Sequence, residues 1–415
     1  MRAPSCTSQI ARNCLAAAIL LLVLLTGCTP TAVVVWTDTP ELVTAVELFN
    51  ASESEHVIEL VYEPELGSAL RLTEDVPDLV VGSFIEDRAT ALMFRPLDRF
   101  VRRELDEEEF YPELFATGKQ NGHYHLLPVA FNLPLLYFTS PVANPETEIV
   151  ISPEEIRSLG EAFNASDDNG WARLAYSPIW DTDFLYQFLR LGGLEPHEGP
   201  RGEPDWSFEN LVRGVSNARE WVELHGGVEA DLPFQAKYLY DPDIQLVRQG
   251  RIAFGYDTSN RYLTRTDAQR NDLDFRWLGG NGTIHVLEDA VYAGIPQGAE
   301  SRQGAERFLA QLLSVNVQRR IIENNLRKRV DTFGVAGGFS SLWRLNESYL
   351  CEYYPELEQK IPPAGRLDFP PASPRHWNKI VDDVVEPWLL REVLGRPQSR
   401  DLEESVRAWL LQQED

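Results

Sequence analysis

The sequence predicts an α/β protein with two domains, and three observations support this. Short segments rich in β-branched residues alternate along the chain with amphipathic segments of helical period. Residues 79–82, Leu-Val-Val-Gly, form the continuous apolar run that is typical of a parallel strand buried on both faces. Strands joined by helices in this order usually form parallel sheets with crossover connections. At 415 residues, the chain is long enough for two domains that each bury a core.

The first expected elements follow one another at short intervals. Residues 33–36, Val-Val-Val-Trp, predict the first strand. Thr39 and Pro40 then mark the start of a helix, because threonine is a common N-cap and proline suits the first helical position. Residues 57–62 predict the second strand and residues 79–82 the third.

The alternation continues toward the C-terminus. Residues 126–138 form a long apolar stretch that Asn132 and Pro134 interrupt, and residues 207–224 form an amphipathic helix that ends at two glycines. Further strands are expected at residues 252–256 and 286–295, and further helices at residues 301–313, 375–394 and 401–412.

The N-terminus predicts export. Arg2 and Arg12 flank an apolar segment at residues 15–25 that is too short to span a bilayer comfortably, which is typical of a signal peptide. The segment ends in Leu25-Thr26-Gly27-Cys28, which resembles a bacterial lipobox. That resemblance implies that residues 1–27 are removed, that Cys28 is acylated, and that residues 28–32 tether the body to the membrane. The alternative is an ordinary secretory signal that contains a cysteine by chance.

The cysteines indicate a fold that depends on its core. Cys6 and Cys14 would leave with the signal and Cys28 would carry lipid, so only Cys351 remains as a free thiol. An exported protein can form disulfides, but the expected mature chain has no pair to form one.

The charge balance limits the partners. The chain carries 64 Asp and Glu residues against 38 Lys and Arg residues, a net charge of −26. Such a surface argues against binding to nucleic acid or electrostatic attraction to anionic lipid, and it leaves room for a cationic ligand or partner. A hydrophobic content of 43% excludes a disordered chain.

Several landmarks occur in an order that is typical of one family. They are Val-Val-Val-Trp-Thr at residues 33–37, Val-Pro-Asp-Leu-Val-Val at 76–81, Gly-His-Tyr-His-Leu-Leu-Pro at 122–128, Gly-Arg-Ile-Ala-Phe-Gly at 250–255, and Ala-Gly-Ile-Pro-Gln-Gly at 293–298 with the helix that follows. In this respect the chain resembles the family 1 extracellular solute-binding proteins, the maltose-binding type that serves ABC importers.

The resemblance implies an α/β, two-lobed, periplasmic-binding-protein-like fold of type II, whose discontinuous lobes are joined by a hinge. Lobe 1 would hold residues 33–130 and 290–343, and lobe 2 would hold residues 131–289. The C-terminal helices, residues 344–415, would belong mainly to lobe 2. The hinge would lie near Phe131 and Ala290.

Candidate ligand residues follow the expected strands or occupy positions that contact ligand in the family. In open α/β sheets, ligands bind outside the carboxyl ends of the strands. Aromatic rings would cover the apolar face of a sugar, while carboxylates and amides would bind its hydroxyl groups. The candidates are Trp36, Asp38, Ser83, Phe84, Asn132, Trp180, Asp181, Tyr256 and Asp257.

Structural alternatives stand beside these candidates. Any of the tryptophans can be a core residue, and Asp181 or Asp183 can cap a helix that starts near Phe184. After Phe254 the chain has Gly-Tyr-Asp where the family commonly has Gly-Ser or Gly-Pro followed by Trp, which leaves the ligand open.

Other motifs favour structural roles. His123 and His125 would point to the same side of a strand, but the Asn-Gly turn before them favours a surface hairpin over a metal site. The basic run at residues 319–329 is expected to be a solvated helix face. The sequence lacks the nucleotide-binding, nucleophile-elbow and zinc-protease motifs, so neither catalysis nor a cofactor nor a metal is expected.

The expected function is that of a monomeric solute-binding lipoprotein that delivers a small ligand, a sugar or oligosaccharide, to the permease subunits of an ABC importer. Three alternatives stay open. The ligand could be a polyamine or another cation, the protein could be an adhesin or sensor on the same fold, or it could be a glycosidase-like hydrolase.

Overall fold

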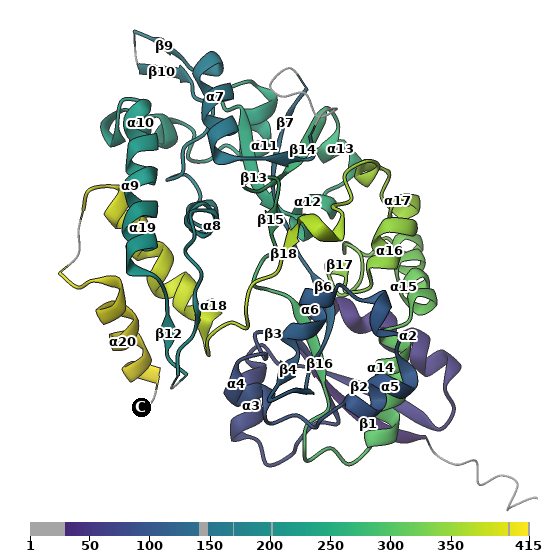
Figure 1. Ribbon diagram of the computed structural model, residues 1–415. Coiled ribbons are helices and arrows are strands. Elements are labelled where there is room, and N and C mark those ends of the chain that lie inside the picture. Colours follow the sequence, from purple (N-terminus) through teal and green to yellow (C-terminus); the bar gives the residue numbers. More distant parts are fainter. Residues whose placement is uncertain (1–29, 141–147, 169, 201, 397–398, 414–415) are drawn as a thin grey trace, which may run out of the picture.

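The computed structural model describes residues 30–140, 148–168, 170–200, 202–396 and 399–413. Two β-sheets lie at different ends of the molecule, each with helices packed around it (Figure 1). We call the part around the six-stranded sheet lobe 1 and the part around the four-stranded sheet lobe 2. Cys28 and the expected signal lie outside the described residues.

The sheet of lobe 1 has the strand order β17-β6-β16-β3-β1-β2. β1 is parallel to β2 and β3, and β16 is antiparallel to both of its neighbours, β3 and β6. The strands are β1 (Thr31–Thr37), β2 (His56–Tyr62), β3 (Leu79–Ser83), β6 (Leu127–Phe131), β16 (Val291–Gly294) and β17 (Phe339–Ser340).

The sheet of lobe 2 has the strand order β13-β7-β14-β8. β7 lies in its interior and pairs antiparallel with β13 and β14, while β8 is parallel to β14. The strands are β7 (Pro134–Thr139), β8 (Val150–Ile151), β13 (Phe254–Thr258) and β14 (Leu273–Leu278).

Helices cover both sheets (Figure 1). Those around the six-stranded sheet are α2 (Val43–Ser52), α3 (Leu66–Leu72), α4 (Arg88–Ala91), α5 (Asp98–Glu104), α6 (Pro112–Thr117), α14 (Arg302–Leu312), α15 (Val315–Lys328), α16 (Trp343–Ser348) and α17 (Leu350–Tyr353). Those of lobe 2 are α7 (Pro153–Phe163), α8 (Thr182–Leu191), α9 (Phe208–Leu224), α10 (Val228–Lys237), α11 (Asp243–Arg248), α12 (Ser259–Leu263), α13 (Asp267–Arg270), α18 (Trp377–Ile380), α19 (Glu386–Val393) and α20 (Leu402–Gln413).

Three segments of the described chain connect the lobes. The first is the two-residue link between β6 and β7, and the second leads from β14 to β16. The third leads from α17 to α18 and includes β18 (Leu367–Asp368), which pairs in parallel with β15 (Ile284–His285) of the second segment. The crossings thus lie side by side and form a hinge.

The C-terminal region is divided between the lobes. α16 packs on α15 and β17 beside the sheet of lobe 1, whereas α19 packs on α8 and α9 of lobe 2. The sequence assigned residues 344–415 mainly to lobe 2, and this assignment holds only for the part that follows β18. The side chain of Leu345, which is fully buried in the first core, explains why α16 stays with lobe 1.

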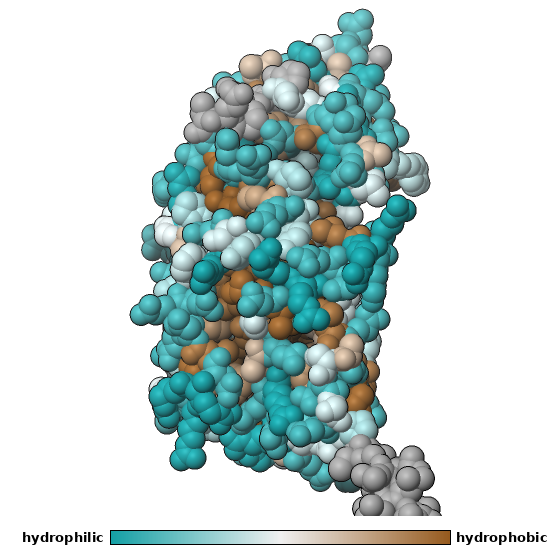
Figure 2. All heavy atoms as spheres, turned by 90° about the vertical axis from the view of Figure 1, so that its right-hand side faces the viewer, coloured by the Kyte–Doolittle hydropathy of each residue, from teal (hydrophilic) through white to brown (hydrophobic). Residues whose placement is uncertain are grey.

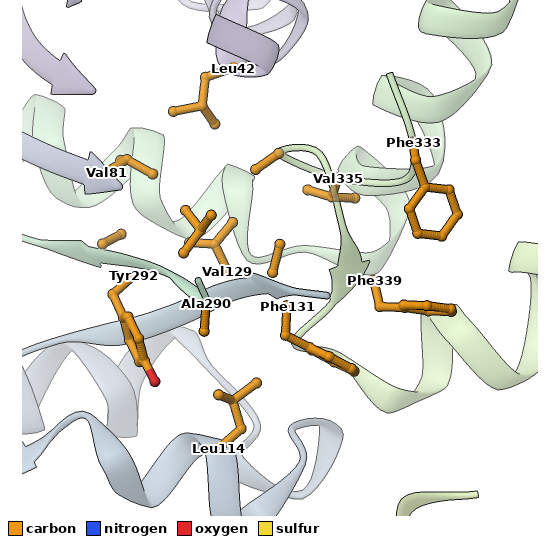
Figure 3. Packing of buried hydrophobic residues seen from close by; sticks show 14 of the residues in the cluster. Leu42, Val81, Leu114, Val129, Phe131, Ala290, Tyr292, Phe333, Val335 and Phe339 are labelled. Atoms are coloured by element: carbon orange, nitrogen blue, oxygen red, sulfur yellow. The ribbon is translucent and has the colours of Figure 1, made fainter. Parts of the chain in front are cut away.

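Two hydrophobic cores underlie the fold. The larger fills lobe 1 and continues through the hinge to Trp277 of β14, and the smaller fills lobe 2 around Trp221 of α9. Figure 3 shows the part of the larger core near the hinge, where Phe131 and Phe339 lie against each other. Their rings stack with centroids 5.7 Å apart, and Phe333 meets Phe339 edge to face at 5.0 Å.

The expected elements occur, and three of the departures from the expected bounds bear on the fold. A 3₁₀ turn, Pro40–Leu42, precedes α2, and the Thr39 side chain does not cap it. The apolar stretch at residues 126–138 is two strands in different sheets, because the chain leaves lobe 1 at Asn132. The expected strand at residues 286–295 is regular only at β16, since its first half belongs to the hinge.

The histidine and arginine motifs have structural roles. His123 lies in a hairpin between β4 (Lys119–Gln120) and β5 (His123–Tyr124) and pairs with Asp98, while His125 is buried against the backbone carbonyl of Phe94. α15 carries the basic run, and Arg319 on it bonds to Tyr353. Figure 2 shows that the face on the right-hand side of Figure 1 is largely hydrophilic, with apolar patches across its middle. None of the helices within the described ranges is long and apolar enough to cross a membrane.

Gly338 allows the chain to pass closely behind the hinge, and its replacement should destabilise the protein. A Cβ atom at this position would lie 2.6 Å from the carbonyl oxygen of Phe131. We expect Gly338→Ala to lower the free energy of unfolding by about 1–3 kcal/mol, as overpacking of a core does. Gly365→Ala is the matched control because a Cβ there meets nothing within 4 Å. Chemical denaturation of the three proteins measures the difference, and equal stabilities would contradict the close approach.

Candidate functional site

A pocket of about 390 Å³ lies between the lobes. Its volume is within the range of small-molecule sites. The residues around it come from five stretches of chain that are distant in sequence: the residue after β3, α8, β13 with α12, the second crossing, and residues 377–386 after the third crossing. They are Phe84, Asp183, Tyr186, Gln187, Tyr256, Thr258, Asn260, Arg261, Leu287, Glu288, Asp289, Trp377, Asn378, Val381, Asp382 and Glu386.

Aromatic side chains give the pocket apolar walls. Phe84 comes from lobe 1, while Tyr186, Tyr256 and Trp377 come from lobe 2. The Tyr186 hydroxyl donates to the Glu288 carboxylate at 2.8 Å and accepts from the Trp377 indole N–H at 3.2 Å. These bonds fix the two rings at the back of the pocket, so that their faces form rigid surfaces for a ligand.

Tyr256 presents a free polar group. The residue is only 7% exposed, and its ring packs edge to face on Phe184 at 5.7 Å. Within the described part of the chain, its hydroxyl has no hydrogen-bond partner. Burial raises the pKa of Tyr256 well above its usual value, so the group stays a neutral O–H. The hydroxyl borders the pocket, so a ligand or water there can complete its hydrogen bonds.

Five carboxyl groups surround the pocket, and basic partners compensate two of them. Arg261 binds Asp183 at 2.8 Å, and Arg190 lies 3.8 Å from Glu288. Asp289, Asp382 and Glu386 have no ion pair with any residue that the structure describes. The pocket is therefore lined by more acidic than basic groups.

The environment opposes ionisation of these three groups. Burial raises the pKa of Glu386 to about 8; the Thr182 hydroxyl bond opposes this shift, and Asp183 and Asp382 add to it. Burial also raises the pKa of Asp289 to about 6, against a hydrogen bond from the Asn132 amide. The pKa of Asp382 is raised by burial and by the charges of neighbouring aspartates. Raised pKa values of this kind are common at functional sites, because such sites hold ionisable groups in buried surroundings close to like charges.

Irregular backbone borders the pocket at two places. Phe84 has a φ of 55° and His376, which precedes Trp377, has a φ of 60°. Both values lie in the left-handed region, which is strained for residues other than glycine. A π-helical turn, Val381–Val385, then follows α18 and turns Val381 and Asp382 toward the pocket. π-Helical turns and strained residues concentrate at functional sites.

Phe84 and Tyr256 are the candidates from the sequence that line the pocket. Three others form a frame beside it. Asp38 accepts from the backbone N–H of Ser83 at 3.0 Å, and the Ser83 hydroxyl donates to the carbonyl oxygen of Asp289 at 3.0 Å. The Asn132 amide donates to the Asp289 carboxylate at 3.2 Å. This frame positions the pocket residue Asp289 from both sides of the hinge.

The remaining four candidates lie away from the pocket. Trp36 is half-buried on β1 against the core of lobe 1. Asp181 caps α8 by accepting from the N–H of Phe184 at 2.9 Å, as one alternative from the sequence held. Asp257 is buried in an ion pair with Arg265 at 2.6 Å.

Trp180 lines a second, smaller pocket of about 200 Å³ in lobe 2. Its indole N–H donates to Asp231 at 2.6 Å, and its ring stacks on Phe234 with centroids 5.6 Å apart. These contacts give Trp180 a packing role in lobe 2.

Sequence reasoning missed most of the polar lining. Tyr186 and Gln187 lie inside a helix, where the sequence pattern indicates only burial. Trp377 and Glu386 lie in the tail, whose helices were expected but whose approach to the hinge was not. The signal that could have found this wall is the set of three acidic residues, Asp382, Asp383 and Glu386, within an otherwise amphipathic helix.

A possible cation cluster on lobe 1 is already neutralised. Glu53, Glu55 and His56 place ligand atoms within 4.8 Å of one another. Arg307 pairs with Glu53 at 3.2 Å and with Glu55 at 2.7 Å, so a basic side chain occupies the place of an ion.

Comparison with solved structures identifies the fold. MalE, the sugar-binding protein of Xanthomonas citri, superposes with a TM-score of 0.65 at 13% identity over 93% of this chain and 100% of its own. The ABC substrate-binding protein Lmo0181 from Listeria monocytogenes, in complex with cycloalternan, gives 0.61 at 12% identity over 91% and 97%. The maltose/maltodextrin-binding domain MalE of Bdellovibrio bacteriovorus, bound to maltotriose, gives 0.57 at 16% identity over 92% and 99%. The chain has the maltose-binding-type solute-binding fold.

The agreement confirms the expected two-lobed α/β architecture, and it covers more than nine tenths of this chain. At these identities it establishes the solute-binding fold and not the ligand. No protein-family model and no curated protein matches the sequence. The residues of the pocket must therefore decide what a protein of this fold binds here.

The raised pKa of Glu386 predicts that stability falls as pH rises. The folded state keeps the proton up to about pH 8, whereas the unfolded chain releases it near the usual value of 4.5. Stability from this group is therefore present below about pH 4.5 and is lost as pH approaches 8. Glu386→Gln should flatten this decline, because the amide resembles the protonated carboxyl and still accepts from Thr182.

Thermal unfolding between pH 5 and 8 measures the effect. Glu347→Gln is the control because this carboxylate is exposed on α16, away from the pocket, and should leave the pH profile unchanged. An unchanged profile for Glu386→Gln would mean that Glu386 is ionised in the folded protein.

Proposed function

We propose that this protein is an exported solute-binding protein that captures a carbohydrate between its lobes and delivers it to the permease of an ABC importer. The observation that carries the proposal is the pocket itself. It lies at the hinge, takes its lining from both lobes, and combines rigid aromatic faces with buried polar groups that lack partners. Structures of the same fold hold cycloalternan and maltotriose, which supports a saccharide as the ligand class.

The pairing of ring faces and polar groups suits a sugar. A pyranose ring has an apolar face that stacks on aromatic side chains and a rim of hydroxyl groups that needs hydrogen bonds. Phe84 and Tyr256 offer the first kind of contact, and Gln187 and Asn260 offer amides for the second. No covalent chemistry is required of the lining, so the proposed role is binding without turnover.

Hinge closure would couple binding to delivery. A ligand favours the closed state only through contacts that it makes with both lobes at once. Phe84 is the lining residue that lobe 1 contributes, while most other contacts come from lobe 2 and the crossings. A bound sugar would therefore draw lobe 1 toward lobe 2 through Phe84, and the closed monomer would dock on the permease.

The proposal includes a lipid anchor at Cys28. β1 begins at Thr31, three residues after that cysteine. At about 3.5 Å per residue, such a link reaches only on the order of 10 Å. An acylated Cys28 would hold lobe 1 close to the membrane surface, where the permease lies.

A binding screen tests the function. The protein that begins at Thr29 should show a saturable rise in melting temperature and a change in tryptophan fluorescence with at least one mono- or oligosaccharide. Chromatography of the saccharide after incubation should recover it unchanged. Hydrolysis would favour a glycosidase, and silence toward every saccharide would contradict the proposal.

The Tyr256 hydroxyl should contribute to affinity. Tyr256→Phe removes only the unpartnered hydroxyl, so we expect affinity for the identified saccharide to fall about 2- to 10-fold, the worth of one neutral hydrogen bond. Tyr262→Phe is the matched control, because Tyr262 is equally buried but does not line the pocket. Isothermal titration calorimetry compares the two, and equal losses would remove Tyr256 from the site.

A further inference from the structure

The charge of the interlobe pocket narrows the ligand class. Resting on the proposed function, we propose that the solute is a saccharide or polyol that carries a protonated nitrogen, and that Asp289, Asp382 and Glu386 bind that nitrogen. A neutral sugar would satisfy the aromatic faces and leave these three carboxyl groups uncompensated.

The described residues supply no cation that could neutralise the three groups. Arg261 is the basic side chain that lines the pocket, and it already binds Asp183 at 2.8 Å and approaches Asp257 at 3.4 Å. Arg190 lies behind the lining, with its guanidinium held by Glu288 and by the carbonyl of Val286. Both guanidinium groups are thus held by other partners, and the charge of Arg261 only opposes, without forming an ion pair, the rise that burial causes in the pKa of Asp289.

Unpartnered atoms show that the lining is incomplete. Oδ1 of Asp289 is buried and, among the residues described, has no hydrogen-bond partner, although Oδ2 accepts from Asn132. The Tyr256 hydroxyl, in a side chain more than nine tenths buried, also has none. Native proteins rarely leave a buried atom such as Asp289 Oδ1 unpaired, and it costs free energy until a partner arrives.

An ammonium group matches this set of atoms. It offers up to three N–H donors and no acceptor, so it pairs with carboxylates without leaving a lone pair facing another acid. Aromatic faces attract the same cation, and Tyr186, Tyr256 and Trp377 lie around the acids. A sugar hydroxyl is also a donor, but it adds another acceptor oxygen and brings no positive charge. The pocket already has many acceptor oxygens and acidic groups, so a hydroxyl matches it less well than an ammonium group.

Matched sugar pairs test the charge directly. Glucosamine, galactosamine and mannosamine would be titrated beside glucose, galactose and mannose, and di-glucosamine beside cellobiose. Each monosaccharide pair differs only by an amine in place of the 2-hydroxyl, and the disaccharide pair differs by two such replacements. We expect the best amine-bearing member to bind at least tenfold tighter than its neutral partner, as charge-assisted hydrogen bonds are stronger than neutral ones. Raising NaCl from 50 to 500 mM should weaken the amine and leave the neutral sugar nearly unaffected.

Neighbouring aspartates provide a matched control. Asp382→Asn should reduce the advantage of the amine by at least fivefold, and Glu386→Gln should do so above about pH 8, where Glu386 is ionised. Asp383→Asn makes the same change one residue away, where the carboxylate accepts from the Trp409 indole and does not line the pocket. It should keep the full preference. Circular dichroism confirms that each variant is folded.

The outcomes separate the two proposals. Neutral sugars that bind as tightly as their amines would overturn the charge inference and keep the carbohydrate function. An equal loss in Asp383→Asn would also overturn it, because the effect would then be that of net charge. Binding of spermidine or Ca²⁺ alone, or no binding to any sugar of either kind, would overturn both.

Discussion

The hydrogen bonds of Asn132 hold together the place where the chain changes lobes, and the rest of the structure depends on them. Its side-chain oxygen accepts from the Ser259 hydroxyl at 2.8 Å, its amide donates to Asp289, and its backbone carbonyl accepts from Leu287. One buried residue thus joins the first crossing, the second crossing and the start of α12. Because a buried amide must satisfy all of its polar atoms, this position specifies how the crossings meet.

The pocket follows from that arrangement. The second crossing brings Asp289 to the pocket only because Asn132 and Ser83 hold it on either side, and the Leu287 backbone is fixed by the same link. Lobe 2 adds its wall through α8, the π-helical turn and the start of α19. Thr182 of α8 donates a hydrogen bond to Glu386 of α19. The pocket is therefore formed by several segments that are distant in sequence. For this reason, no short sequence motif reveals it.

The sequence predicted the sheets better than the site. The alternation of strand-like and helix-like segments and the β-branched runs located β1, β2 and β3. The predicted start of a helix at Ser207 agrees with α9, of which Ser207 is the N-cap. The rule that ligands bind beyond strand ends selected Phe84 and Tyr256, and both line the pocket. It also placed Asp257 there, although neighbours on a strand point to opposite sides, and Asp257 turns instead to Arg265.

The residues that the sequence did not predict share a physical reason. Trp377 and Glu386 reach the pocket because a third crossing returns the tail to the hinge, and tertiary packing of that kind leaves no periodic signal. Trp180 shows the converse, since an indole beside a strand end can equally stack on Phe234 and bond to Asp231. An aromatic residue at an expected position can therefore be assigned as a ligand surface or as a core residue only when its contacts are known.

The excess acid has a consequence for the motion of the lobes. Closing the pocket removes water from carboxyl groups whose ionisation burial already opposes, and a less polar surrounding makes their charged forms still more costly. In the proposed mechanism an empty pocket would favour the open state, because the acids stay solvated there. With a cation in the pocket, the acids would favour closure instead of opposing it. The cation would replace water as the partner of the acids, and it would do so best when Phe84 has closed over it. The same charges would then prevent closure without the ligand and stabilise closure with it, so that the closed form presented to a permease is a loaded one.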